Sequence, residues 1–207
     1  MNAAIQKDSE LIRNYDENGV SCVELLPGVL DYPFKAFKYN LKKGSHVSPP
    51  QYADKVAVFI FGSGSGHIAD VEGGFIIDRL CFYAPNFDKS DYTIYATSDL
   101  EFIMCICDMN DYDRQRASEC RVHLPYFRTI DQCYRYEQYC KTEGVESRSV
   151  LFGDCGRLGK ITIGYYNGFD NAGTIEKGHR EVHQFNYAIG EDCDFLMVVE
   201  GESDRVF

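Results

Sequence analysis

The sequence has no tryptophan, no long apolar run and few basic residues. Its longest uninterrupted apolar stretch, VAVFIF at residues 56–61, is far shorter than the roughly 20 residues that span a bilayer. The first ten residues, MNAAIQKDSE, lack the basic and then apolar pattern of a secretory signal. Since 44% of the 207 residues are hydrophobic, the chain can still bury a sizeable core. The sequence therefore predicts a globular cytoplasmic protein with no membrane partner.

The charge balance argues against a nucleic-acid partner. The chain has 21 basic and 32 acidic residues, which gives a formal net charge of −11. The basic residues form no cluster that would neutralise a row of phosphates. The carboxylates are spread along the whole chain, which is typical of ordinary solubility rather than of an acidic interaction surface.

Nine cysteines, an odd number in a chain of this length, do not indicate a disulfide scaffold. Cys105 and Cys107 alternate within FIMCICDM, so a strand would place both thiols on one face, unlike the Cys-x-x-Cys turn of a zinc site. We therefore expect buried, reduced thiols. No Gly-x-Ser-x-Gly elbow and no Cys–His arrangement supports covalent catalysis. The GSGSG stretch at residues 62–66 lacks a Gly-Lys-Ser/Thr ending and predicts a hairpin turn.

Short β-rich runs separated by Gly, Asp and Ser turns predict an all-β, mainly antiparallel fold. Residues 20–108 hold about seven such runs, enough for one small barrel. Within residues 113–147, the spacing of Ile130, Cys133 and Tyr134 predicts a short linker helix. We expect four segments: an N-terminal arm at 1–19, a first unit at 20–112, a linker with a helix at 113–147 and a second unit at 148–207.

Local phrases in the two units resemble the cupin superfamily of small jelly-roll barrels. In the first unit, His46, Gln51 and Asp54 precede GSGSG, and LCFYAPNFDKSDYTIYA then keeps Pro85 of the second cupin motif without its histidine. In the second unit, AGTIEKGHREVHQFNYAIGEDCDFLMVVEGE is similar to a first cupin motif. The resemblance implies tandem cupin jelly-roll barrels, a bicupin arrangement. The second motif of the second barrel would lie beyond residue 207, so that barrel is expected to be incomplete.

The second unit also resembles (S)-ureidoglycine aminohydrolase-like bicupins. Their Glu-x-His-x-x-x-His pattern matches here at His179 and His183, with Lys177 at the position of the glutamate. The resemblance implies a divalent metal, Mn, Fe, Ni or Zn, that is held by His179 and His183 with help from Glu176. The alternative is that His179 lies in a turn with its ring in solvent and His183 is an ordinary strand residue.

Two further residues are candidates for catalysis. Residues 179, 181 and 183 would share one strand face, which brings Glu181 to the same side as the two histidines. Tyr187 offers an apolar ring and a hydroxyl donor, although tyrosine is also a common strand residue.

The sequence leaves two functions open. The first is a metal-dependent cupin enzyme, of hydrolase, lyase or isomerase type, that activates a small polar metabolite by Lewis-acid chemistry. The second is a non-catalytic cupin-like protein that binds a small ligand or serves as a dimeric scaffold. Pro49 and Pro50 favour an extended loop at the candidate ligands of the first unit, which predicts a metal-free first barrel. Exposed sheet edges make a homodimer the expected assembly.

Overall fold

In this computed structural model, the described residues are 6–29, 34–86, 91–119, 123–135, 145–151, 158, 161–168, 185, 187–189, 198–199 and 205–206. All strand pairings among them are antiparallel. The expected all-β, mainly antiparallel fold class is confirmed.

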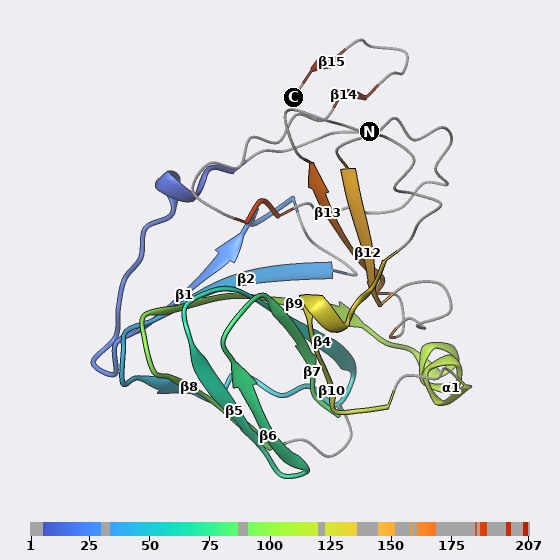
Figure 1. Ribbon diagram of the computed structural model, residues 1–207, viewed down its shortest axis with the longest axis horizontal. Coiled ribbons are helices and arrows are strands. Elements are labelled where there is room, and N and C mark those ends of the chain that lie inside the picture. Colours follow the sequence, from blue (N-terminus) through green and yellow to red (C-terminus); the bar gives the residue numbers. More distant parts are fainter. Residues whose placement is uncertain are drawn as a thin grey trace.

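Six strands form the larger sheet, in the order β1-β2-β9-β4-β7-β10. They are β1 (Val20–Leu25), β2 (Phe34–Leu41), β4 (Lys55–Ser63), β7 (Cys81–Ala84), β9 (Leu100–Asp108) and β10 (Tyr126–Thr129). Four strands form the smaller sheet, in the order β3-β8-β5-β6. They are β3 (His46–Val47), β5 (Gly66–Asp70), β6 (Gly73–Ile77) and β8 (Tyr92–Ala96). The two sheets face each other as a jelly-roll barrel (Figure 1).

The remaining elements lie outside these two sheets. A separate three-stranded sheet contains β11 (Tyr134–Arg135), β12 (Val145–Leu151) and β13 (Ile163–Gly168), and β14 (Val198–Val199) pairs with β15 (Arg205–Val206). The helical elements are α1 (Asp111–Glu119) and the two 3-10 turns η1 (Asp8–Glu10) and η2 (Ile130–Gln132). At nine residues, α1 is the longest helix of the described chain, and no described helix is long and apolar enough to cross a membrane.

Alternation along each strand gives the larger sheet two buried faces. Toward the smaller sheet, Ala57, Phe59 and Phe61 of β4 pack with residues such as Ile68 and Ile94 to fill the barrel. Phe59, Phe61 and Tyr83 inside the barrel and Phe82 on the outer face are each at most 2% exposed, and Phe75 is partly buried against the barrel core. The barrel interior is therefore an aromatic core.

The outer face of the larger sheet is also covered. Val56, Val58 and Phe82 pack there with Val150 and Leu151 of β12. Figure 1 shows β12 and β13 on the side of the larger sheet away from β5, β6 and β8. On the same outer face, Leu11, Ala36 and Cys105 form a smaller cluster to which Phe185 and Tyr187 add.

The GSGSG stretch forms a tight β4–β5 turn, but the predicted hairpin is wrong, because β4 and β5 belong to different sheets and do not pair. Gly64 has φ +87°, and a Cβ there would lie 2.1 Å from the carbonyl oxygen of Asp99. Only glycine fits, because both the positive φ and the close backbone exclude a side chain. The turn is thereby pressed against the β8–β9 connection, where Thr97 N–H donates to the Ser65 carbonyl at 2.9 Å.

The helix predicted around Ile130 and Cys133 is wrong within the described residues. Ile130–Gln132 form a 3-10 turn and Tyr134–Arg135 form strand β11. Cys133 is 3% exposed because it packs in the outer core with Val150, so tertiary contacts, not helical periodicity, explain its apolar spacing. The short helix of this region is α1 instead.

Candidate functional site

The histidines on the strands of the smaller sheet lie on its outer face. His46 of β3 and His67 of β5 pair in register with Tyr95 of β8. Their rings stack on either side of the Tyr95 ring, with centroids 5.5 Å and 4.8 Å from it. This face of the smaller sheet is solvent-accessible, since Tyr95 is 37% exposed. The two imidazoles therefore point away from the barrel interior and are separated by a phenol ring.

The described barrel interior does not suit a metal ion. Interior positions that could carry ligands carry rings instead, such as Phe59, whose ring centroid lies 5.6 Å from that of Tyr92 and 5.9 Å from that of Phe102. Among the described residues, no three His, Cys, Asp or Glu side chains are arranged to hold a metal ion.

Of the five predicted site residues, the metal ligands His179, His183 and Glu176 and the catalytic Glu181 lie outside the described residues. The fifth, Tyr187, is described. Its ring lies against the outer face of the larger sheet, and its hydroxyl donates to Glu101 Oε1 at 2.8 Å. Burial raises the pKa of the Tyr187 phenol, and the hydrogen bond and negative charge of Glu101 raise it further. The phenol is thus held neutral as a donor.

Tyr187 belongs to a polar cluster around a buried lysine. The Lys38 side chain is 3% exposed, and its Nζ lies 2.8 Å from Glu101 Oε1 and in contact with Asp8. It also lies 5.7 Å from the centroid of the Tyr187 ring. Arg13 forms a second ion pair with Asp8. The cluster joins the N-terminal arm and Tyr187 to the barrel, because Asp8 contacts Lys38, and Tyr187 contacts both Lys38 and Glu101.

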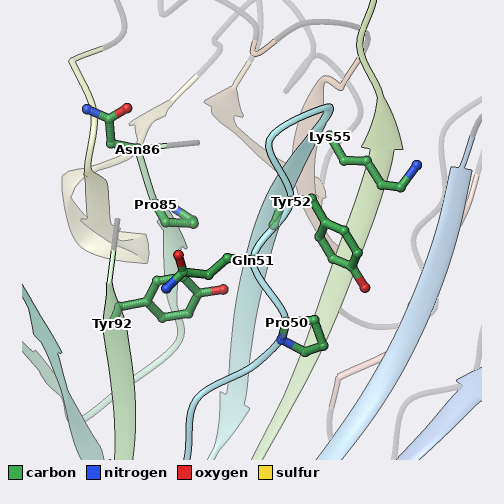
Figure 2. A pocket seen from close by; sticks show the side chains of 8 residues that line it. Pro50, Gln51, Tyr52, Lys55, Pro85, Asn86 and Tyr92 are labelled. Carbon is green, nitrogen blue, oxygen red and sulfur yellow. The ribbon is translucent and has the colours of Figure 1, made fainter. Parts of the chain in front are cut away.

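A separate pocket opens at the mouth of the barrel, between the β3–β4 and β7–β8 connections (Figure 2). It contains about 280 Å³ of empty space, which includes open solvent, and the centre of a water-sized group can reach about 20 Å³ of it. The lining consists of two prolines, two amides, two phenols, a lysine and an alanine: Pro50, Pro85, Gln51, Asn86, Tyr52, Tyr92, Lys55 and Ala57. This space has room for one water-sized group.

Tyr92 is the buried polar group of this pocket. The residue is 2% exposed, and its hydroxyl has no hydrogen-bond partner in the described structure. Figure 2 shows the Tyr92 ring directing its hydroxyl toward the side of the pocket that carries Gln51 and Tyr52. Burial raises the pKa of Tyr92, and the nearby Tyr52 and Asp70 raise it further, so the hydroxyl stays protonated.

The pocket rim is charged, mainly negatively. Gln51 Nε2 donates to Asp91 Oδ1 at 3.5 Å. Lys55 forms ion pairs with Asp108 and, at 3.7 Å, with Asp54. The hydrogen bond with Asp108 is the main cause that raises the pKa of Lys55, so the lysine stays protonated and neutralised by these carboxylates.

Sequence reasoning predicted neither the Tyr92 site nor the Lys38 cluster. In DYTIYA, Tyr92 looks like any strand tyrosine, and nothing local shows that its hydroxyl lacks a partner. The Pro49–Pro50 pair was the one available signal, since it predicted an extended loop where the pocket rim now lies.

The comparisons with known proteins concern the fold. No protein-family description matches the chain, and no curated protein matches it. A glyoxylate-induced protein from Pseudomonas aeruginosa superposes with a TM-score of 0.50 and 10% identity over 65% of this chain and 50% of its own. For a cupin 2 conserved barrel domain protein from Leptotrichia buccalis, the TM-score is 0.46 and the identity 12%, over 70% of this chain and 57% of that protein. For ectoine synthase from P. lautus, the TM-score is 0.44 and the identity 16%, over 52% of this chain and 80% of that protein.

The superposition on the Pseudomonas protein shows a fold and nothing narrower. The matched part of the chain spans half of the Pseudomonas protein, and 10% identity is too low to carry an activity across. The antiparallel jelly-roll barrel defines the protein as one with the cupin fold.

Proposed function

We propose that this cupin-fold protein binds a small polar ligand in the pocket at the barrel mouth. The observation that carries the proposal is the Tyr92 hydroxyl, which is buried, protonated and without a partner in the described structure. An unpaired buried hydroxyl costs about 1–3 kcal/mol. A ligand atom that hydrogen-bonds to Tyr92 would recover that cost, which gives the pocket a reason to bind.

The shape of the pocket limits the ligand to a small molecule. Only about 20 Å³ of its space can be reached by the centre of a water-sized group, so a single small group fits into it. The rings of Pro50 and Pro85 form rigid walls, and Gln51 and Asn86 offer amide groups at the rim. One polar group of the ligand would lie inside the pocket beside Tyr92, and the rest of the ligand would lie at its solvent-open side.

The test is ligand screening by NMR on protein with ¹³C-labelled tyrosine, using small polar compounds. Tyr92→Phe identifies the Tyr92 signal and removes the proposed contact. Tyr95→Phe is the matched control, because Tyr95 lies on the outer face of the smaller sheet. Binding that shifts the Tyr52 and Tyr92 signals supports the proposal when the Tyr52 shift is lost in Tyr92→Phe and kept in Tyr95→Phe. If no compound in the screen gives this result, the proposal is refuted.

The second candidate function is a metal-dependent enzyme whose site lies in residues 148–207. It rests on the His-x-x-x-His spacing of His179 and His183, with Glu176 as a third ligand. A bound Mn, Fe, Ni or Zn ion would supply Lewis-acid activation of a small polar metabolite. In this proposal Glu181 moves a proton, and Tyr187 acts as a donor. The tandem bicupin arrangement, a cytoplasmic location and a homodimer belong to the same proposal.

Elemental analysis of protein purified without chelators tests this second function. The double variant His179→Ala, His183→Ala should lose the metal. The matched control is His46→Ala, His67→Ala, which removes two imidazoles from the outer face of the first barrel and should leave the metal content unchanged. Equal metal content in all three proteins would refute the His179–His183 site.

A further inference from the structure

We propose that the group which enters the mouth pocket is a primary ammonium, so that the ligand is a small amine. This inference rests on the proposed ligand site and names its chemical class. Two independent observations support it: the charges around the pocket, and the buried Tyr92 hydroxyl that faces it.

The charges around the pocket favour a cation. Four carboxylates act on the lining residues: Asp91 through Gln51, Asp54 and Asp108 through Lys55, and Asp70 through its field at Tyr92. Two cations oppose them in the described structure, Lys55 itself and Arg114, whose guanidinium binds the Ala53 carbonyl. Because Lys55 is already neutralised by two of the carboxylates, an incoming carboxylate would meet net repulsion. An ammonium would meet net attraction.

The space that a water-sized group can reach selects among cations. About 20 Å³ accommodates a single water-sized group. An ammonium is a single heavy atom, whereas a guanidinium or a carboxylate places several heavy atoms at its charged end. The primary ammonium is therefore the charged group that fits beside Tyr92.

Tyr92 and Tyr52 provide the contacts that such a group needs. The neutral Tyr92 oxygen has lone pairs free to accept an N–H bond, because it has no partner in the described structure. The phenol of Tyr52 lies close enough to act electrostatically on both Tyr39 and Tyr92. Its ring forms part of the wall and can contribute a cation–π contact. The pocket thus pairs an acceptor with an aromatic wall, which is a common way to bind an amine.

The experiment titrates tyrosine-labelled protein with ethylammonium, ethanol and acetate at pH 7 and constant ionic strength, following the Tyr92 signal by NMR. Ethylammonium should bind at least about tenfold more tightly than acetate, and ethanol should lie between them. Raising the salt concentration should weaken ethylammonium binding to the unaltered protein. Asp91→Asn should weaken it roughly threefold. Asp78→Asn is the control. Asp78 directly follows β6, pairs with Arg79 and does not line the pocket, so this variant should bind ethylammonium as tightly as the unaltered protein.

The outcomes separate this inference from the site itself. Acetate or ethanol binding as tightly as ethylammonium would overturn the amine assignment and leave the ligand site standing. Ethylammonium binding that neither salt nor Asp91→Asn weakens would also overturn it, because the carboxylates would then have no role. If none of the three probes, and no other small polar compound, shifts the Tyr92 signal, the proposed site falls as well.

Discussion

Tyr83 and Tyr92 pack edge to face inside the barrel, with ring centroids 5.6 Å apart and ring planes at 67°. Both are buried, yet their hydroxyls differ. Tyr83 donates its hydroxyl to the Asp70 carboxylate, whereas Tyr92 Oη has no partner in the described structure. Two neighbouring residues of the same type therefore carry opposite roles, one as a structural donor and one as a free group facing the pocket.

This difference predicts opposite effects of deleting each hydroxyl. Tyr92→Phe should leave the free energy of unfolding unchanged or raise it by up to about 1 kcal/mol, because it removes an unpaired buried hydroxyl. Tyr83→Phe should lower it by about 1–2 kcal/mol, because the bond to Asp70 is lost. Urea denaturation of the two variants measures both changes. Equal destabilisation would mean that the Tyr92 hydroxyl is already hydrogen-bonded in solution and is not available to a ligand.

Replacing the buried Lys38 should lower the free energy of unfolding more than replacing an exposed lysine. Lys38→Met removes the common partner of Asp8 and Glu101 and should lower the free energy of unfolding by about 1–2 kcal/mol. This is less than the usual loss for a buried pair, since both carboxylates are partly exposed. Lys42→Met is the control, because the Lys42–Asp99 pair is exposed on both sides and should change stability by no more than about 0.5 kcal/mol. Similar losses in the two variants would contradict a structural role for Lys38.

The same cluster predicts a loss of stability in acid. Partial burial raises the pKa of Asp8, but the hydrogen bonds and charges of Lys38 and Arg13 lower it by more, so the net shift is downward. A carboxyl with a lowered pKa in the folded state stabilises the fold above its unfolded pKa of about 3.9 and loses this effect as the pH falls below it. The unaltered protein should therefore lose more stability than Lys38→Met between about pH 5 and 3. Parallel pH profiles of the two proteins in urea denaturation would exclude the Asp8–Lys38 contact in solution.

The strands and turns follow from local sequence, whereas the sites depend on distant contacts. Alternation and the GSGSG turn predict the barrel strands, because a strand places successive side chains on opposite faces. Lys38 shows the limit of that reasoning. In FKAFKYNL it looks like an outward, solvated position, but the outer face of the larger sheet is covered by the arm and by the 185–189 segment. Whether a second face is buried is decided by chain segments far away in the sequence.

The cysteines give a prediction that depends on burial. Burial raises the pKa of Cys81 and of Cys105 to about 12, so both remain thiols at neutral pH and are shielded from reagents. Cys22, on β1, is exposed. Among the five described cysteines, native alkylation with iodoacetamide at pH 8, followed by peptide mass spectrometry, should modify Cys22 first. Modification of Cys81 or Cys105 at the rate of Cys22 would show that the barrel opens easily.

The position of β10 predicts that the first folding unit extends past residue 112. Phe127 of β10 pairs with Tyr83 of β7, and its ring stacks on Phe75 of β6 with centroids 5.0 Å apart. These contacts join the last strand of the larger sheet to the edge of the smaller sheet, and thus close the barrel on that side. Phe127→Ala in the full chain should lower the free energy of unfolding by about 2–3 kcal/mol, since the ring is only partly buried.

Tyr112→Ala is the control for that variant, because Tyr112 of α1 is 63% exposed and its loss should change stability by no more than about 0.5 kcal/mol. Urea denaturation compares the two. A large loss in Phe127→Ala alone means that the barrel needs β10, although the sequence pattern places that strand in a linker. Equally small losses in both variants would mean that the barrel is complete without β10, and the boundary near residue 112 would then hold.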